Sequence, residues 1–121
     1  MHKHTDAMAK TVAFLSIGCR TNQEEIFGPV VTLMPFKTEE EAIALANGTE
    51  YGLAASIWTQ DDVRAKRVAA KIESGIVWVN CWNVRDLNTP FGGVKKSGIG
   101  REGGVRALEF FTEEKTISRI I

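Results

Sequence analysis

The chain has 121 residues, and its 15 Lys and Arg residues balance its 15 Asp and Glu residues, so its formal net charge is zero. Its hydrophobic share of 44% and charged share of 25% are typical of soluble globular domains and argue against disorder, collagen-like repeats and a disulfide scaffold. Zero net charge gives no electrostatic reason to expect nucleic-acid or membrane binding. No run approaches the ~18 to 20 apolar residues of a membrane-spanning helix. We therefore expect one soluble, cytoplasmic domain.

The N-terminal lead and the two cysteines carry weak signals. The short apolar run over 12–15 follows a basic start, but it is too short for a signal peptide and no small-x-small cleavage site follows it. His2 and His4 could contact a metal, although a mobile terminus explains them more simply. Cys19 and Cys81 form neither a CxxC pair nor a zinc-type cluster, so no metal site and no disulfide framework is predicted.

The first predicted elements are a strand and a helix. Residues 30–34 form a β-branched apolar run that Pro35 stops, which predicts a strand. Thr38 and Glu41 then match a capping box, in which the Thr38 hydroxyl accepts from the Glu41 amide and the Glu41 carboxylate reaches back. Apolar residues at helical spacing follow, and Gly48 ends the predicted helix.

Two more strands flank a second helix. Residues 53–58 predict a strand, Asp61 can cap the helix that follows, and Gly75 is expected to stop it. The unbroken apolar run over 76–79 is typical of a strand covered on both faces. The order predicts an α/β fold with a βαβαβ core and three parallel strands. The second helix should place four residues inward: Ala65, Val68, Ala69 and Ile72.

A glycine-rich loop, a short helix and a final strand are expected to end the chain. Six of the 11 glycines fall between Gly92 and Gly104, which indicates a loop where the backbone passes close to another element. A short helix over 104–110 and a strand over 115–121 follow. Because nothing after this strand covers it, its edge is a pairing hazard unless another chain takes it. This pattern favours a homo-oligomer.

Residues 98–103 match the pattern GxGxxG and precede a helix. The dinucleotide fingerprint also requires a strand directly before it and an acidic residue ~20 positions later, which would lie beyond Ile121. A glycine-rich connecting loop therefore explains the segment better.

Residues 24–29 make a poor helix and a poor strand. A carboxylate such as that of Glu25 can accept hydrogen bonds from the vicinal hydroxyls of a ribose. The ring of Phe27 could pack against a flat heterocycle. Taken alone, a solvated acidic turn with one buried phenylalanine is the simpler explanation.

Residues 80–93 follow the carboxyl end of a predicted parallel strand, the edge where open α/β sheets bind ligands. Arg85 stands among the aromatic residues Trp82 and Phe91 and could clamp a carboxylate, because its planar fork matches a carboxylate bidentately. The alternative is a salt bridge with Asp86 or another surface acid.

Three motifs together resemble one family: residues 24–29, residues 90–93 with Lys95, and residues 97–102. From about Gln23 to Ile121 the sequence resembles the C-terminal part of an NAD(P)-dependent aldehyde dehydrogenase, with the family's order and spacing. Its Trp-x-Val-Arg-Asp-Leu stretch further resembles the 2-hydroxymuconic and 2-aminomuconic semialdehyde dehydrogenases of aromatic-ring degradation. Residues 1–22 form a non-matching lead.

The resemblance implies an aldehyde substrate, an incomplete site for NAD or NADP, and a last strand that crosses to a neighbouring subunit. It also implies a role for each matching residue. Glu25 binds the nicotinamide ribose hydroxyls and Phe27 lies beside the nicotinamide. Arg85, with Trp82 beside it, binds the substrate carboxylate. Phe91 lines the aldehyde tunnel, and Glu102 supports a proton path.

The family's nucleophilic cysteine stands in a Gly-Gln-x-Cys motif and its general-base glutamate in a Glu-Leu-Gly-Gly-like motif, and neither motif occurs here. Cys81 matches a structural position, and the strands that would hold adenine and pyrophosphate are missing too. We therefore expect a truncated semialdehyde dehydrogenase, inactive alone, with no catalytic residue of its own. The alternative is a non-catalytic module for oligomerisation or assembly, and a stand-alone nucleotide binder is the weakest interpretation.

Overall fold

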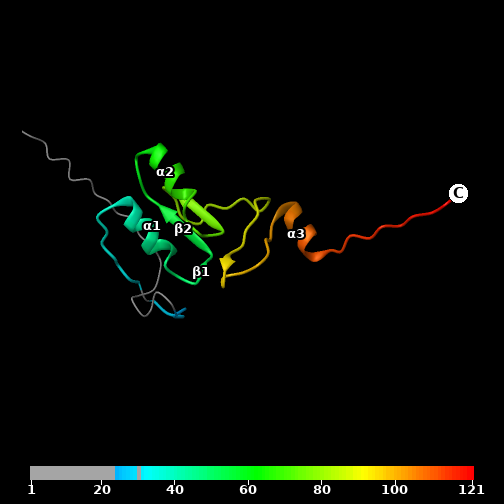
Figure 1. The fold of residues 1–121 in the computed structure, drawn as a ribbon, viewed down its shortest axis with the longest axis horizontal. Helices are drawn as coiled ribbons and strands as arrows, with labels where there is room; N and C mark the ends of the chain where they lie inside the picture. The colour runs from blue at the N-terminus through cyan, green and yellow to red at the C-terminus, as the bar shows by residue number, and fades with distance from the viewer. Residues whose placement is uncertain (1–23, 30) are drawn as a thin grey trace, which may run out of the picture.

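A parallel pair of strands, with two helices beside it, holds the core of the chain in a computed structural model that describes residues 24–29 and 31–121 (Figure 1). The expected α/β class is confirmed for this part of the chain, while the lead 1–22, with Cys19, lies outside the described residues. In chain order the elements are α1 (Glu39–Asn47), β1 (Tyr51–Gly52), β2 (Ala54–Ile57), α2 (Asp62–Ala69), β3 (Ile76–Val79), β4 (Val94–Lys95) and α3 (Gly104–Phe111).

Helix α1 begins with the predicted cap. The Thr38 hydroxyl accepts a hydrogen bond from the Glu41 amide at 3.1 Å. The Glu41 carboxylate reaches back, but it accepts from the amide of Lys37 at 2.7 Å, one residue before the N-cap. The helix ends at Asn47 with Gly48 after it, as expected.

The last residue of α1 fixes the loop that follows α2. The Asn47 side-chain amide donates to the Lys71 carbonyl at 2.8 Å, and its oxygen accepts from the Glu73 amide at 2.9 Å. These two bonds join the side chain to the backbone of the loop and hold the C-terminal end of α1 beside the segment that leads into β3.

Helix α2 begins at the predicted Asp61 cap, whose carboxylate accepts from the amides of Val63 and Arg64 at 3.0 Å each. The expectation that Gly75 stops this helix is wrong. The helix ends at Ala69, and the next residue, Ala70, donates its amide back to the Lys66 carbonyl at 3.1 Å.

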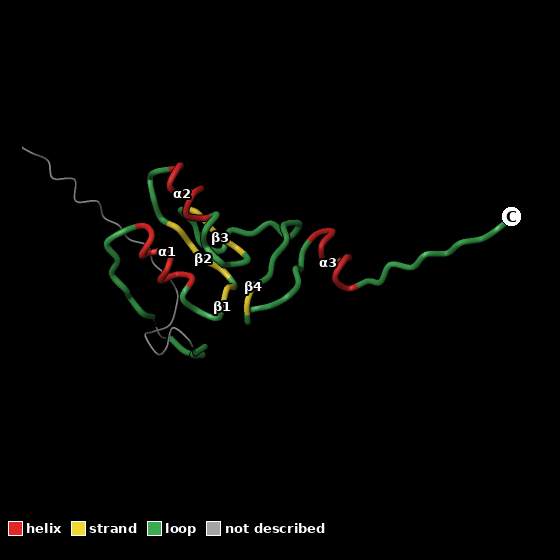
Figure 2. The backbone as a smooth tube through the Cα atoms, in the orientation of Figure 1, coloured by secondary structure: helices red, strands yellow, loops and turns green. Residues whose placement is uncertain are grey.

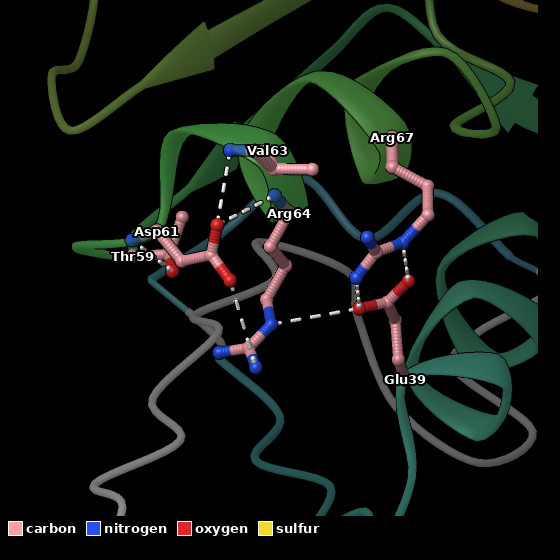
Figure 3. A network of polar contacts seen from close by, with 6 residues as sticks. All are labelled: Glu39, Thr59, Asp61, Val63, Arg64 and Arg67. Carbon is pink, nitrogen blue, oxygen red and sulfur yellow. Dashed lines mark hydrogen bonds and ion pairs between the residues drawn. The ribbon is translucent and has the colours of Figure 1, made fainter.

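An ion-pair network joins α1 to α2 (Figure 3). The Glu39 carboxylate accepts two hydrogen bonds from the Arg67 guanidinium, both 2.7 Å long, and lies 3.5 Å from Nε of Arg64. The hydrogen bonding to Arg67 lowers the pKa of Glu39 below its ordinary value of 4.5. The backbone amide of Arg64 likewise lowers the pKa of Asp61.

The core lies between α2 and the parallel pair β2–β3, in which Ala54 pairs with Ile76 and Ile57 pairs with Val79. Three of the four predicted inward residues of α2 and its following turn are buried, and Ala69 is half-buried. Helix α1 adds Ile43 and Ala46 to the same cluster. The buried members of this cluster are Ala55, Ile57, Val68 and Ile72.

The predicted three-stranded parallel sheet is reduced to two strands. Residues 31–34 form no strand, because no backbone ladder joins them to β2 or β3 within the described residues, and Val30 lies outside these. Among the described residues β3 therefore has one strand neighbour, β2, and its residues are half-buried or, at Val79, exposed rather than covered on both faces. A second, antiparallel pair, β1–β4, was not predicted.

The short C-terminal helix is confirmed as α3, but the final strand over 115–121 is wrong as an element of this single chain (Figure 2). These residues run away from α3 with every side chain exposed, including Ile117 and Ile120. A strand requires a partner strand, and the described part of the chain places none beside them. In residues 24–29 and 31–121, no helix has the length and apolarity to cross a membrane.

Candidate functional site

The loop that carries the candidate site leaves β3 at a fixed turn. Asn80 has a positive φ of 53°, which asparagine tolerates, and so directs the chain away from the strand. Its side chain accepts from the Thr59 amide and donates to the Thr59 carbonyl, at 2.8 Å each. The Ser56 hydroxyl donates to the Cys81 carbonyl at 2.5 Å. These bonds anchor the loop to the carboxyl end of β2.

Two tryptophans stand where β3 ends. The rings of Trp78 and Trp82 are tilted by 59° with centroids 5.1 Å apart, and Nε1 of Trp78 donates to the Val84 carbonyl at 2.8 Å. Trp82 is 54% exposed, so part of its ring is open to a ligand. Sequence reasoning missed Trp78, although two tryptophans on either side of a strand end are a readable signal.

A backbone bridge brings two predicted site residues together. The amide of Phe91 donates to the carbonyl of Glu102, and the amide of Glu102 donates to the carbonyl of Phe91, both at 2.7 Å. The bridge holds these two residues side by side although the glycine-rich loop separates them in the sequence.

The glycines of this loop permit the close approach that the sequence predicts. A Cβ on Gly92 would collide with the Gly100 carbonyl oxygen. The Arg101 guanidinium, which sequence reasoning did not single out, closes the loop by donating to the carbonyls of Gly93 and Gly100 at 2.7 and 2.8 Å. The GxGxxG match at 98–103 therefore lies in a connecting loop.

Arg85 joins this pair from the preceding loop. Its Nη2 lies 2.5 Å from Oε1 of Glu102, and its guanidinium carbon lies 4.1 Å from the centroid of the Phe91 ring. The structure thus shows the alternative of a salt bridge with a surface acid, and that acid is Glu102. The Asp86 carboxylate instead accepts from the amide of Asn88 at 2.8 Å. We call Arg85, Phe91 and Glu102 the arginine cluster.

The arginine cluster has the chemistry of a carboxylate receptor. The aromatic face of Phe91 supports the cation, since the negative face of a ring attracts a guanidinium. The Arg85 side chain is 33% exposed, so donors of its planar fork remain open to a ligand. Trp82, the exposed ring that follows β3, contacts Trp78 and is not part of this cluster in the described residues.

The two predicted cofactor residues lie outside this cluster. Glu25 is exposed and makes no hydrogen bond or ion pair with the rest of the described chain. Phe27 is 92% exposed, so the buried phenylalanine of the simpler alternative is wrong, whereas Glu24 and Glu25 are exposed as a solvated acidic turn requires. An exposed carboxylate and an exposed ring two residues apart fit, by type, the vicinal hydroxyls and flat ring of a nicotinamide riboside.

Comparison with known proteins identifies relatives of the whole segment. A family model described as "Aldehyde dehydrogenase family" matches residues 15–117. The chain is 60% identical over 103 residues to 2-hydroxymuconic semialdehyde dehydrogenase of Pseudomonas sp. strain CF600, covering 85% of this chain and 21% of that protein. It is 58% identical over 96 residues to 2-aminomuconic semialdehyde dehydrogenase of Danio rerio, covering 79% and 20%.

Solved structures agree with the sequence matches. The crystal structure of betaine aldehyde dehydrogenase from Staphylococcus aureus in complex with NAD+ superposes with a TM-score of 0.72 at 50% identity, covering 76% of this chain and 18% of that one. The chain thus spans about a fifth of the length of the proteins it matches.

Proposed function

Because the chain belongs to the aldehyde dehydrogenase family, we propose that it is the substrate-recognition and nicotinamide-side segment of an NAD(P)-dependent enzyme that oxidises carboxylated semialdehydes. Two kinds of observation support this. Relatives at 60% and 58% identity are named for muconic semialdehydes, whose conjugated chains carry a carboxylate. The arginine cluster places a cation directly on the aromatic ring of Phe91.

Each residue of the segment has a proposed task. Arg85 binds the substrate carboxylate and thereby fixes the distance of the aldehyde carbon from that anchor, which is how a bidentate clamp aids catalysis. Phe91 and Trp82 flank the apolar part of the substrate. Glu25 accepts from the ribose hydroxyls of the cofactor, and Phe27 packs beside its nicotinamide. When bound, NAD or NADP accepts the hydride that leaves the substrate.

The covalent chemistry requires residues beyond these. Oxidation of an aldehyde in this family starts with a thiolate and ends with a carboxylate that activates water. The family motifs for both groups are absent from this sequence. The thiol of Cys81 is half-buried after β3 and has no predicted catalytic role. We therefore propose that the segment acts with these groups supplied from outside it, and that Glu102 supports a proton path.

The contact between Arg85 and the Phe91 ring is the observation on which this function depends. A chimera tests it, in which residues 23–121 of this chain replace the matching segment of the Pseudomonas sp. strain CF600 enzyme. We expect the chimera to form NADH from 2-hydroxymuconic semialdehyde and NAD, and the isolated chain to form none. Turnover by the isolated chain, or a folded chimera without turnover, would contradict the proposal.

A second function from another class is supported by the C-terminal segment. Residues 112–121 are exposed and rich in isoleucine, and the edge of such a segment can pair with another chain. The chain could therefore act as an assembly module that associates with itself through residues 115–121.

A further inference from the structure

Glu102 occupies only part of the hydrogen-bonding capacity of Arg85. Nη2 is the guanidinium nitrogen that contacts Glu102, at 2.5 Å. Within the described residues Nε and Nη1 of Arg85 make no hydrogen bond. A guanidinium has five N–H donors, and its best geometry for a carboxylate uses two of them side by side. The pair seen here is therefore a single-point contact that a bidentate ligand can improve upon.

The ion pair between Arg85 and Glu102 is also exposed enough to dissociate. The side chains of Glu102 and Arg85 are 59% and 33% exposed, and ion pairs in such positions contribute little net stability. A released Glu102 carboxylate would remain hydrated at its exposed position. The backbone bridge between Phe91 and Glu102 does not involve either side chain, so Glu102 can turn away while its main chain stays fixed.

Arg85 keeps its support when Glu102 turns away. The guanidinium carbon of Arg85 lies over the Phe91 ring, 4.1 Å from its centroid, whereas Glu102 contacts the terminal nitrogen Nη2. A ligand carboxylate approaching this nitrogen meets the negative charge of Glu102, and two carboxylates at one guanidinium repel each other. Glu102 and an incoming carboxylate therefore cannot both bind the guanidinium of Arg85 favourably.

We propose that Glu102 and the substrate carboxylate compete for Arg85, so that Glu102 occupies the guanidinium until substrate arrives and sets how tightly carboxylated substrates bind. This inference rests on the proposed function, because it takes Arg85 as the carboxylate anchor. It makes Glu102 a determinant of specificity, since an aldehyde without a carboxylate has no means to displace it.

The test uses the purified chain and hexanoate, observed by NMR chemical-shift titration, with hexanamide as the uncharged probe. In Glu102→Gln the competing charge is gone, and hexanoate affinity should rise about fivefold, the scale of an exposed ion pair. In Arg85→Gln hexanoate binding should be lost. The matched control is Glu109→Gln, which removes the same charge from another exposed arginine pair, Arg106–Glu109 at 2.6 Å, and should leave the affinity unchanged.

The outcomes separate this inference from the proposed function. An unchanged or lower hexanoate affinity in Glu102→Gln would overturn the competition, as would an equal gain in Glu109→Gln or the absence of hexanoate binding to any variant. An equal rise in hexanamide affinity in Glu102→Gln would show that the charge of Glu102 does not oppose ligand binding, and this result would also overturn the competition. Because the titration requires neither cofactor nor nucleophile, a chimera that fails to oxidise semialdehydes would leave a tightened Glu102→Gln affinity standing.

Discussion

Gly75, the residue before β3, lies so close to Gly92 that a Cβ on Gly75 would collide with the Gly92 carbonyl oxygen. The contact joins the core strand to the loop that bears Phe91. It therefore links the stability of the fold to the position of the arginine cluster.

Gly75→Ala should lower the free energy of unfolding by about 1 to 3 kcal/mol, because the methyl group meets backbone and the strand or the loop must shift. Urea denaturation of the purified chain measures the change. Gly28→Ala is the matched control, since nothing lies within 4 Å of a Cβ there. Equal stability of the two variants would show that the close approach is not maintained in solution.

Acid should weaken the link between α1 and α2. The pKa of Glu39 is lowered in the folded chain by its hydrogen bonds to Arg67, and that of Asp61 is lowered by backbone amides. A carboxyl group with a depressed folded pKa stabilises the fold above its unfolded pKa, and this stabilisation disappears as the pH falls through the folded value. Stability should therefore decline once the pH drops below about 4.5.

Glu39→Gln should remove part of this acid sensitivity, which urea midpoints at neutral and acidic pH would measure. Glu40→Gln is the matched control, because Glu40 also lies in the first turn of α1 but forms no ion pair within the described chain. If the wild-type chain and Glu39→Gln lose stability in parallel on acidification, the pairing with Arg67 does not control the transition.

Local rules predicted the parts of the fold that local interactions determine. The caps at Thr38 and Asp61 need only a side-chain oxygen and the amides two or three residues later, so the sequence identified both helix starts. Strands over 30–34 and 115–121 depend on partners, and the described chain provides no ladder for either. The apolar pattern therefore identifies segments that are able to form a strand, but it does not determine whether a partner strand lies beside them.

The candidate site was predictable in composition but not in arrangement. The resemblance named Arg85, Phe91 and Glu102 together, whereas the bridge that joins Phe91 to Glu102 follows from how the glycine-rich loop folds back. From its residues alone the sequence offered a salt bridge of Arg85 with Asp86 or another surface acid, and the structure shows the second of these, with Glu102. Asp86 instead accepts from the amide of Asn88, a local bond that short acidic side chains form readily in turns.

The exposed C-terminal segment predicts self-association. The purified chain should sediment as an oligomer, and the double substitution Ile117→Lys with Ile120→Lys should shift it to the monomer, since charge on a strand edge opposes pairing. Ile99→Lys changes an equally exposed residue, 94% exposed, outside this segment and should leave the assembly intact. A folded wild-type monomer in sedimentation velocity would contradict the assembly function.

The most direct measurement compares kcat/KM of the chimera and its Arg85→Ala variant on 2-hydroxymuconic semialdehyde and on hexanal, which has no carboxylate. Loss of a charged anchor should cost about 2 kcal/mol or more on the carboxylated substrate, a roughly 30-fold fall in kcat/KM. Hexanal oxidation should be nearly unchanged. An equal fall for both aldehydes would show that Arg85 maintains structure and does not recognise the carboxylate.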